Sequence, residues 1–251
     1  MAYPPTRVNL AGGFFYHVRA ASAGRRWRPF TDALGAWLTD CLPASPRLVL
    51  VGPSAAYCLE DAFLSRYPEI TALEPDPVAR WLLARRARRL GIRSLEFVTD
   101  DRLVAPLVEG RPALDDVLDG LPAASVVFCN VLGQVRFLLA EPEHEKWQLA
   151  WTERITPRLC RHPWASFHDR VSAAVPPRLT MPHRAPSRLS DQEMVRTFYG
   201  GVAVRVELLD HLTGGLFPEE LPHAYFHWEL ERGAHHLIEA VGLPRSGTVT
   251  L

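Results

Sequence analysis

The sequence predicts an α/β protein with a mainly parallel central sheet, and three observations carry this prediction. Short apolar runs that end at glycine or proline recur, as in residues 48–51 before Gly52, and such runs are typical of strands buried on both faces. Stretches with helical spacing separate them at intervals of roughly 20 to 30 residues, as in βαβ units. Near the end of the chain, two segments flanking the turn 231–234 predict an antiparallel hairpin.

The individual elements follow from the same patterns. Seven strands are expected, at residues 48–51, 70–74, 95–99, 126–129, 164–168, 224–230 and 235–241. Helices are expected at 27–41, 56–66, 77–90 and 143–156. The helix at 77–90 has the clearest boundaries, because Pro77 suits a first helical turn and Gly91 suits a C-terminal stop.

The 251 residues are long enough to bury a full core, and we expect a single domain. Its parts are an N-terminal helical extension at 1–45, a core at 47–170, a loop at 171–190 and C-terminal strands at 191–251. The loop is expected because that stretch is rich in proline and has little periodicity.

Composition excludes several classes of protein. The 28 basic and 28 acidic side chains balance, so no global positive field favours a nucleic-acid partner. No apolar run approaches the roughly 18 residues of a membrane span, and the cytoplasm is the expected location. The four cysteines are widely spaced and indicate neither a disulfide framework nor a zinc site. His223, His227, His235 and His236 could gather near the hairpin, but without a supporting Asp or Glu spacing no metal is expected.

A small-residue turn and an acidic residue stand at an informative spacing. Gly52, Pro53, Ser54 and Ala56 follow the first strand, and Glu74 ends the next strand 22 residues after Gly52. In nucleotide-binding βαβ units the first turn lets the backbone approach the ligand, and an acidic side chain about 20 residues later bonds the ribose hydroxyls. A turn of small residues also occurs without a ligand in many α/β proteins.

These features resemble the class I S-adenosylmethionine-dependent methyltransferases. Against their first motif, an acidic residue, any residue and then Gly-x-Gly-x-Gly, the chain supplies Leu50, Gly52, Ser54 and Ala56, so one glycine of three remains. The resemblance implies a Rossmann-like fold, with helices on both faces of the sheet and a last strand that runs against the others. It also implies S-adenosylmethionine as the cofactor, bound by the turn at 52–56, Pro53 included.

The resemblance assigns roles to further residues. Glu74 would grip the ribose diol, and Asp101, with Asp100 as the alternative, would face adenine. Asn130, at the carboxyl end of the fourth strand, would begin the active-site loop and contact both cofactor and acceptor. The alternatives without a ligand are that the two aspartates are solvated loop carboxylates and that Asn130 forms a hydrogen bond to its own backbone.

His168 is the other candidate catalytic residue, because it closes the fifth strand at the edge where parallel sheets bind ligands. Histidine titrates near neutrality and could take a proton from an acceptor. A polar cluster that anchors the following loop is the competing interpretation.

The expected function is therefore methyl transfer to a small molecule or a protein side chain. The alternative is a methyltransferase-like binding or scaffold module without catalysis, motivated by Leu50, Ser54 and Ala56. A nicotinamide-dependent oxidoreductase is a weaker third hypothesis. The pyrophosphate of its cofactor would need close contact with a glycine-rich backbone, and two of the three glycines are absent here.

Overall fold

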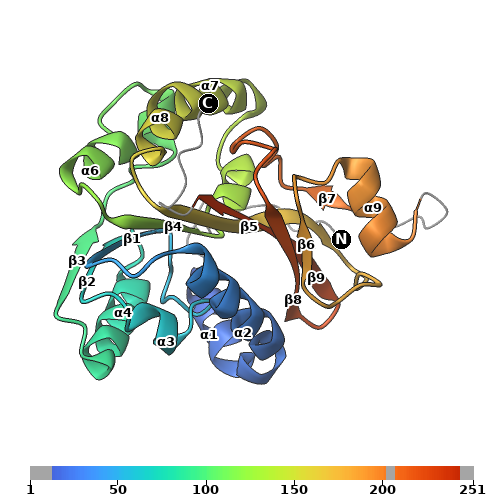
Figure 1. Cartoon of the computed structure of the whole chain (residues 1–251), viewed down its shortest axis with the longest axis horizontal. Coiled ribbons are helices and arrows are strands. Elements are labelled where there is room, and N and C mark those ends of the chain that lie inside the picture. Colours follow the sequence, from blue (N-terminus) through green and yellow to red (C-terminus); the bar gives the residue numbers. More distant parts are fainter. Residues whose placement is uncertain (1–12, 202–206, 244–251) are drawn as a thin grey trace.

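The computed structural model describes residues 13–201 and 207–243 and contains one nine-stranded sheet with helices on both faces (Figure 1). The strands are β1 (Arg47–Val51), β2 (Glu69–Leu73), β3 (Ser94–Val98), β4 (Ser125–Cys129), β5 (Trp164–Ala173), β6 (His183–Ala185), β7 (Leu209–Asp210), β8 (His223–Glu231) and β9 (Ala234–Leu243). The helices are α1 (Gly13–Ser22), α2 (Gly24–Cys41), α3 (Asp61–Leu64), α4 (Pro77–Leu90), α5 (Ala105–Val108), α6 (Leu114–Gly120), α7 (Glu141–Ala150), α8 (Thr156–Leu159) and α9 (Asp191–Tyr199). The short helices η1 (Leu132–Phe137) and η2 (Trp151–Ile155) complete the chain order.

The strands lie in the order β3-β2-β1-β4-β5-β9-β8-β6, and β7 pairs with β5 outside this path. β1 to β5 are parallel neighbours in that order, whereas β9 runs antiparallel to both β5 and β8. The predicted fold class is thus confirmed, including the reversed last strand, and two short strands, β6 and β7, extend the predicted set of seven.

Two hydrophobic cores cover the two faces of this sheet. In Figure 1, α1 to α4 lie on one side and α6 to α8 on the other. The first core joins Leu34 of α2 and Leu83 of α4 to Leu50 of β1, and the second joins Val49 of β1 to Trp147 of α7. β1 is buried on both faces, as its continuous apolar run predicts.

The helix boundaries at α4 match the sequence in physical detail. Asp76 caps the helix by accepting from the backbone N–H of Val78 and Ala79, Pro77 occupies its first turn, and Gly91 ends it in the left-handed region at φ 70°. Each device satisfies or removes a free backbone group at a helix end.

The prediction of a helix at 56–66 is wrong, since within this range only Asp61–Leu64 is helical. Ala56 has φ 58°, which a right-handed helix cannot contain. The carbonyls of Ala56 and Leu59 instead accept hydrogen bonds from the Arg86 guanidinium of α4. A contact between distant segments therefore overrides local helix propensity here.

The prediction for residues 191–251 also needs correction. This part of the chain was expected to contain strands, but it begins with helix α9. Ser190 and Glu193 form a capping box, and Met194 and Phe198 face the core one helical turn apart. The expected loop at 171–190 contains the end of β5 and all of β6, and the expected helical extension at 1–45 contains α1 and α2. Residues 202–206, within the expected C-terminal strand region at 191–251, lie outside the described residues. Among the described helices, none is long and apolar enough to cross a membrane.

Candidate functional site

The turn after β1 keeps a glycine-like backbone although two of its key residues are not glycine. Gly52, Ser54 and Ala56 have φ values of 63°, 52° and 58°. L-residues avoid this region because Cβ approaches the backbone, at a cost of roughly 1 to 2 kcal/mol per residue. Ser54 and Ala56 therefore hold the conformation of a glycine-rich loop at an energetic cost.

Gly52 is required for a reason that the sequence did not reveal. A Cβ at this position would lie 2.6 Å from the Cβ of Val131, in the segment after β4. The close approach at Gly52 is thus to a neighbouring side chain of the protein itself.

Glu74 immediately follows β2 and is 2% exposed. Its Oε2 accepts from the backbone N–H of Ser54 at 2.7 Å, and its Oε1 accepts from the N–H of Asp76 at 2.9 Å. Burial raises the pKa of this carboxyl, against the effect of the two backbone bonds. Glu74 is therefore placed beside the first turn, where it holds the two loops together.

The side-chain hydroxyl of Ser54 forms no hydrogen bond to the described residues. Its Oγ is buried and has no hydrogen-bond partner among residues 13–201 and 207–243. A buried hydroxyl without a partner costs free energy unless a ligand supplies one. The loop thus presents an unpaired polar group beside Glu74, which fits an adenosyl cofactor with its ribose at this edge.

The two aspartates after β3 behave differently from Glu74. The carboxylate of Asp101 accepts from the backbone N–H of Leu103, Val104 and Ala105 at 2.8 to 2.9 Å. Asp100 is exposed and pairs with Arg102 at 2.8 Å. Asp101 orders the turn before α5, and neither side chain is brought to Glu74 by a described contact.

Helix α1 closes over the carboxyl ends of β1 and β2. The two ring nitrogens of His17 lie 3.0 Å from the Tyr57 hydroxyl and 3.0 Å from Oδ2 of Asp76. His17 is 6% exposed, and its contact with the cap of α4 helps to hold the pKa of Asp76 below its usual value despite burial. α1 is therefore fastened to both loops that flank the candidate cofactor position.

Asn130 lies at the end of β4 and has φ 55°, a third non-glycine residue in the left-handed region at this edge. Its side-chain amide is bonded to the neighbouring strand β5. Oδ1 accepts from the Asp169 N–H at 2.8 Å, and Nδ2 donates to Asp169 Oδ2 at 3.0 Å. Gln134 also donates to Asp169, at 3.2 Å. Asn130 thus positions a carboxylate that the sequence analysis did not select.

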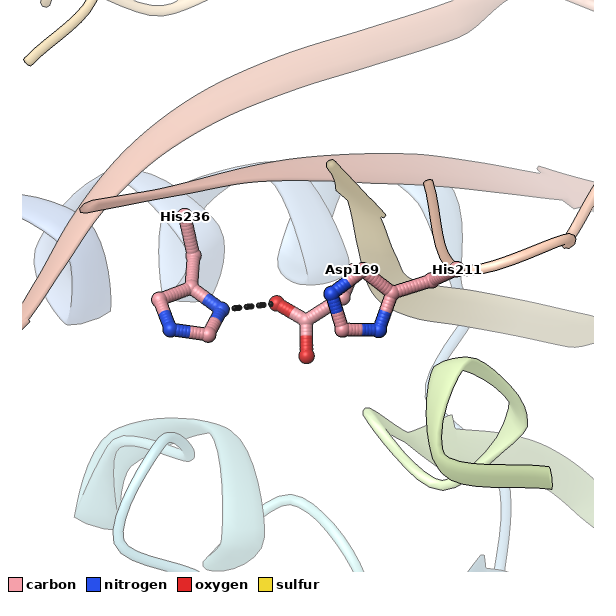
Figure 2. A group of neighbouring side chains, drawn as sticks. All are labelled: Asp169, His211 and His236. Atoms are coloured by element: carbon pink, nitrogen blue, oxygen red, sulfur yellow. Dashed lines mark hydrogen bonds and ion pairs between the residues drawn. The ribbon is translucent and has the colours of Figure 1, made fainter. Parts of the chain in front are cut away.

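Asp169 is the centre of a polar cluster that spans three strand regions (Figure 2). Its Oδ1 lies 2.7 Å from Nδ1 of His236 in β9, and His211, next to β7, approaches from the other side. Although burial opposes it, the charges of His236 and His211 hold the pKa of Asp169 well below its usual range. Asp169 in turn raises the pKa of His236, against the lowering effect of burial.

His168 lies on the opposite face of β5 and is not brought to Asn130. It is 2% exposed, its Nδ1 is 2.9 Å from the Ser166 hydroxyl, and its nearest carboxylate is Glu239. Burial lowers its pKa to about 3, helped by Arg188 and His223. A neutral imidazole of such low basicity is a poor proton acceptor near neutral pH, and its surroundings fit the anchoring cluster.

A surface cleft of about 610 Å³ opens beside this edge, between α1, α2, α4 and the segment after β1. Ala55 and Tyr57 line it together with Arg85 and Arg86, whereas Gly52 and Glu74 do not. The cleft therefore adjoins the first turn from the side of the helices.

Comparisons with known proteins give matches to solved structures at low similarity. No protein-family model matches the chain, and no curated protein matches it. Similar solved structures include the N-methyltransferase NodS from Bradyrhizobium japonicum WM9 in complex with S-adenosyl-L-homocysteine. That pair has 12% identity and a TM-score of 0.44, and covers 92% of this chain and 97% of the other.

Two further structures are similar at the same level. The N-terminal domain of EvdMO1 with S-adenosylhomocysteine bound has 14% identity and a TM-score of 0.42, covering 86% of this chain and 81% of its own. An rRNA methylase from Streptococcus thermophilus has 13% identity and a TM-score of 0.37, covering 84% and 95%. These values are too low to transfer an activity, and the methyltransferase-like fold is assigned on strand order and direction.

Proposed function

From the methyltransferase-like fold, we propose that this chain binds S-adenosylmethionine at the carboxyl ends of β1 and β2 and transfers its methyl group to a small molecule or a protein side chain. One observation carries the proposal. The turn at 52–56 keeps three left-handed residues, two of them not glycine, and its backbone is bonded to Glu74. Strained backbone of this kind clusters at binding and catalytic sites.

Different residues at this edge would contact different parts of the cofactor. Ser54 offers its unpaired hydroxyl and Glu74 offers the remaining lone pairs of its carboxylate, both beside the turn. When bound, S-adenosylmethionine supplies an activated methyl group on a sulfonium. The protein's own contribution is to hold the two reactants in line and to exclude water, for which α1 and its His17 contacts are suitably placed.

We place the methyl acceptor beside Asn130, on the side of the sheet edge that faces β5. Asn130 fixes Asp169 there, and the Asp169–His236 pair is the nearest titratable pair. His236 in its neutral form can accept a proton from an oxygen or nitrogen acceptor, and Asp169 stabilises the imidazolium that forms; His168 is badly placed to do this.

Calorimetric titration of the purified chain with S-adenosylmethionine and S-adenosylhomocysteine tests the proposal. Binding is expected in the wild type, and Glu74→Gln is expected to weaken it about tenfold through loss of a charge-assisted bond. Glu69→Gln is the matched control, since Glu69 begins the same strand at its other end and pairs with Arg47 and Arg93. Equal affinity in a folded Glu74→Gln protein would place the ribose elsewhere.

A binding module without catalysis is the second candidate, and a specific observation favours it. Glu74, Asp101 and Asn130, three residues selected for ligand contact, all bond to the protein's own backbone. Wild-type protein that binds neither adenosyl compound at millimolar concentration would exclude the enzyme and leave this function.

A further inference from the structure

We propose that Asp169, His211 and His236 form a binding site for a divalent transition-metal ion, with Zn²⁺ as the probe. One ligand atom from each residue lies within 4.8 Å of the others. Two imidazoles and one carboxylate are the donors that such ions take in proteins with open coordination positions.

The orientation of His211 favours metal binding. Its Nδ1 lies 2.9 Å from the carbonyl oxygen of Gly133 and therefore donates a proton to it. In the neutral ring, Nε2 then carries the lone pair, and in Figure 2 this side of the ring faces the Asp169 carboxylate. A histidine whose far nitrogen donates to a carbonyl is held in the tautomer that ligates metals.

Asp169 is held in the same manner. Amide groups of Asn130 and Gln134 donate to its Oδ2, so Oδ1 is the oxygen that faces His236. The carboxylate is 1% exposed and cannot rotate into water. Both Asp169 and His211 therefore have their ligand atoms fixed by neighbours outside the cluster.

The register of β5 against β9 places Asp169 and His236 on one face. Asp169 pairs with Ile238, and Ile238 and His236 are two residues apart on β9, so their side chains point to the same side. A β-bulge follows at Arg170, and beyond it Ser172 pairs with His236 and joins the same face. Bulges of this kind re-aim side chains next to functional sites.

The dimensions are close to those of an occupied site. A tetrahedral ion with bonds of about 2.1 Å needs ligand atoms about 3.4 Å apart. The Asp169–His236 edge is a hydrogen bond of 2.7 Å, which must open by about 0.7 Å when an ion replaces its proton. The three ligand atoms all lie within 4.8 Å of one another. The ion would take the lone pair of His211 Nε2 in place of the Ser172 hydroxyl, which lies 3.1 Å from it.

Three protein ligands leave a coordination position for water or for an acceptor group, as in catalytic zinc sites. The ion would lie beside Asn130, at the edge where we place the acceptor. Asp169 and His236 are also the pair that we place beside the acceptor, but the metal ligands share no residue with the turn at 52–56, so metal binding can be measured without adenosyl compound.

Calorimetric titration of the chelator-treated full chain with Zn²⁺, without adenosyl compound, tests the site. One ion per chain is expected, and Mg²⁺, which prefers oxygen ligands, should give no comparable heat. His211→Ala and Asp169→Asn should each weaken Zn²⁺ binding by more than about a hundredfold. The double variant His227→Ala, His235→Ala is the control, because those rings pair with each other at 3.0 Å elsewhere on the hairpin.

A measurement on the wild type keeps the proposal falsifiable if a buried variant fails to fold. Co²⁺ bound by imidazole and carboxylate should give visible ligand-field absorption that Zn²⁺ abolishes. Wild type without this absorption, or Zn²⁺ binding that is lost in the hairpin control and kept in His211→Ala, would overturn the proposal.

Discussion

At the residue scale, the main feature of this protein is backbone strain at the carboxyl edge of the sheet. Of the five non-glycine residues with positive φ in the described ranges, Ser54, Ala56 and Asn130 lie at the ends of β1 and β4. The sequence shows two of these as missing glycines but cannot show that the loop keeps its shape without them. The bond from the Ser54 N–H to buried Glu74 is what holds it.

Ser54→Gly separates the strain from the binding role of the hydroxyl. The free energy of unfolding should rise by about 1 kcal/mol, because relief of the left-handed conformation exceeds the entropy gained by the unfolded chain. Affinity for S-adenosylhomocysteine should fall, since the buried Oγ is removed. Denaturant unfolding and calorimetry measure the two effects.

Ala123→Gly is the matched control for this variant. Ala123 is exposed, has φ 62° and precedes β4 at its other end. It should gain similar stability without any change in affinity. An affinity that is unaltered in Ser54→Gly as well would remove Ser54 from the cofactor site.

At the element scale, α1 acts as a cover whose position depends on a few polar contacts. His17 joins it to Tyr57 after β1 and to Asp76 after β2. Aromatic packing of Tyr16 against Trp27 and Tyr57 adds an apolar contribution. The sequence analysis did not identify this helix, because its start carries two glycines and it has no acidic residue in its first turn.

His17→Ala should loosen α1 while the sheet stays intact. Amide hydrogen exchange in residues 13–22 should become faster, because the helix loses both polar links to the sheet edge. Affinity for S-adenosylhomocysteine should fall in parallel. Ser22→Ala controls for a change within the helix, since its hydroxyl donates to the carbonyl of Arg19 in the same helix. If exchange in α1 is the same in His17→Ala and wild type, apolar packing alone holds the helix.

At the scale of the whole molecule, the long β5–β9–β8 region separates two polar clusters by face. Asp169 and His236 lie on one face, whereas His168, Arg170 and Glu239 lie on the other. Glu239 is 1% exposed and contacts Arg170, Arg188 and His223, so the second cluster is an internal ion-pair network. Its buried histidines make the stability of the fold depend on pH.

His223 supplies a testable part of that dependence. Burial lowers its pKa from 6.5, partly opposed by Glu239 and Glu219, while Arg188 lowers it further. A depressed pKa in the folded state stabilises the fold above the unfolded value, and this stabilisation is lost as pH falls below about 6.5. In His223→Gln, the free energy of unfolding should fall less steeply between pH 7 and pH 5, by at most about 1.4 kcal/mol per pH unit.

Urea unfolding at several pH values measures this slope. Thr152→Ala serves as the control, since Thr152 is exposed and its hydroxyl donates to the carbonyl of Gln148, one helical turn earlier. A His223→Gln protein with the same pH dependence as wild type would mean that the pKa of His223 does not differ between the folded and unfolded states.

The sequence by itself determined the fold class and the positions of β1 to β5 and the β8–β9 hairpin. Continuous apolar runs and their stops are local signals that burial on both faces of a sheet enforces. It also located Gly52, Ser54, Ala56, Glu74 and Asn130 at strand ends, because parallel strands bring their carboxyl ends to one edge.

Only the tertiary structure decided which polar groups meet at that edge. The register of β5 against β9 turns Asp169 toward His236 and His168 toward Glu239, and it shifts by one residue at the bulge that follows Asp169. A shift of one residue in register exchanges the two faces of a strand, and no local pattern in residues 164–173 specifies where that shift falls. The prediction of a helix at 56–66 was also wrong because of a contact between distant residues. Hydrogen bonds from Arg86 satisfy the carbonyls that a helix would otherwise use.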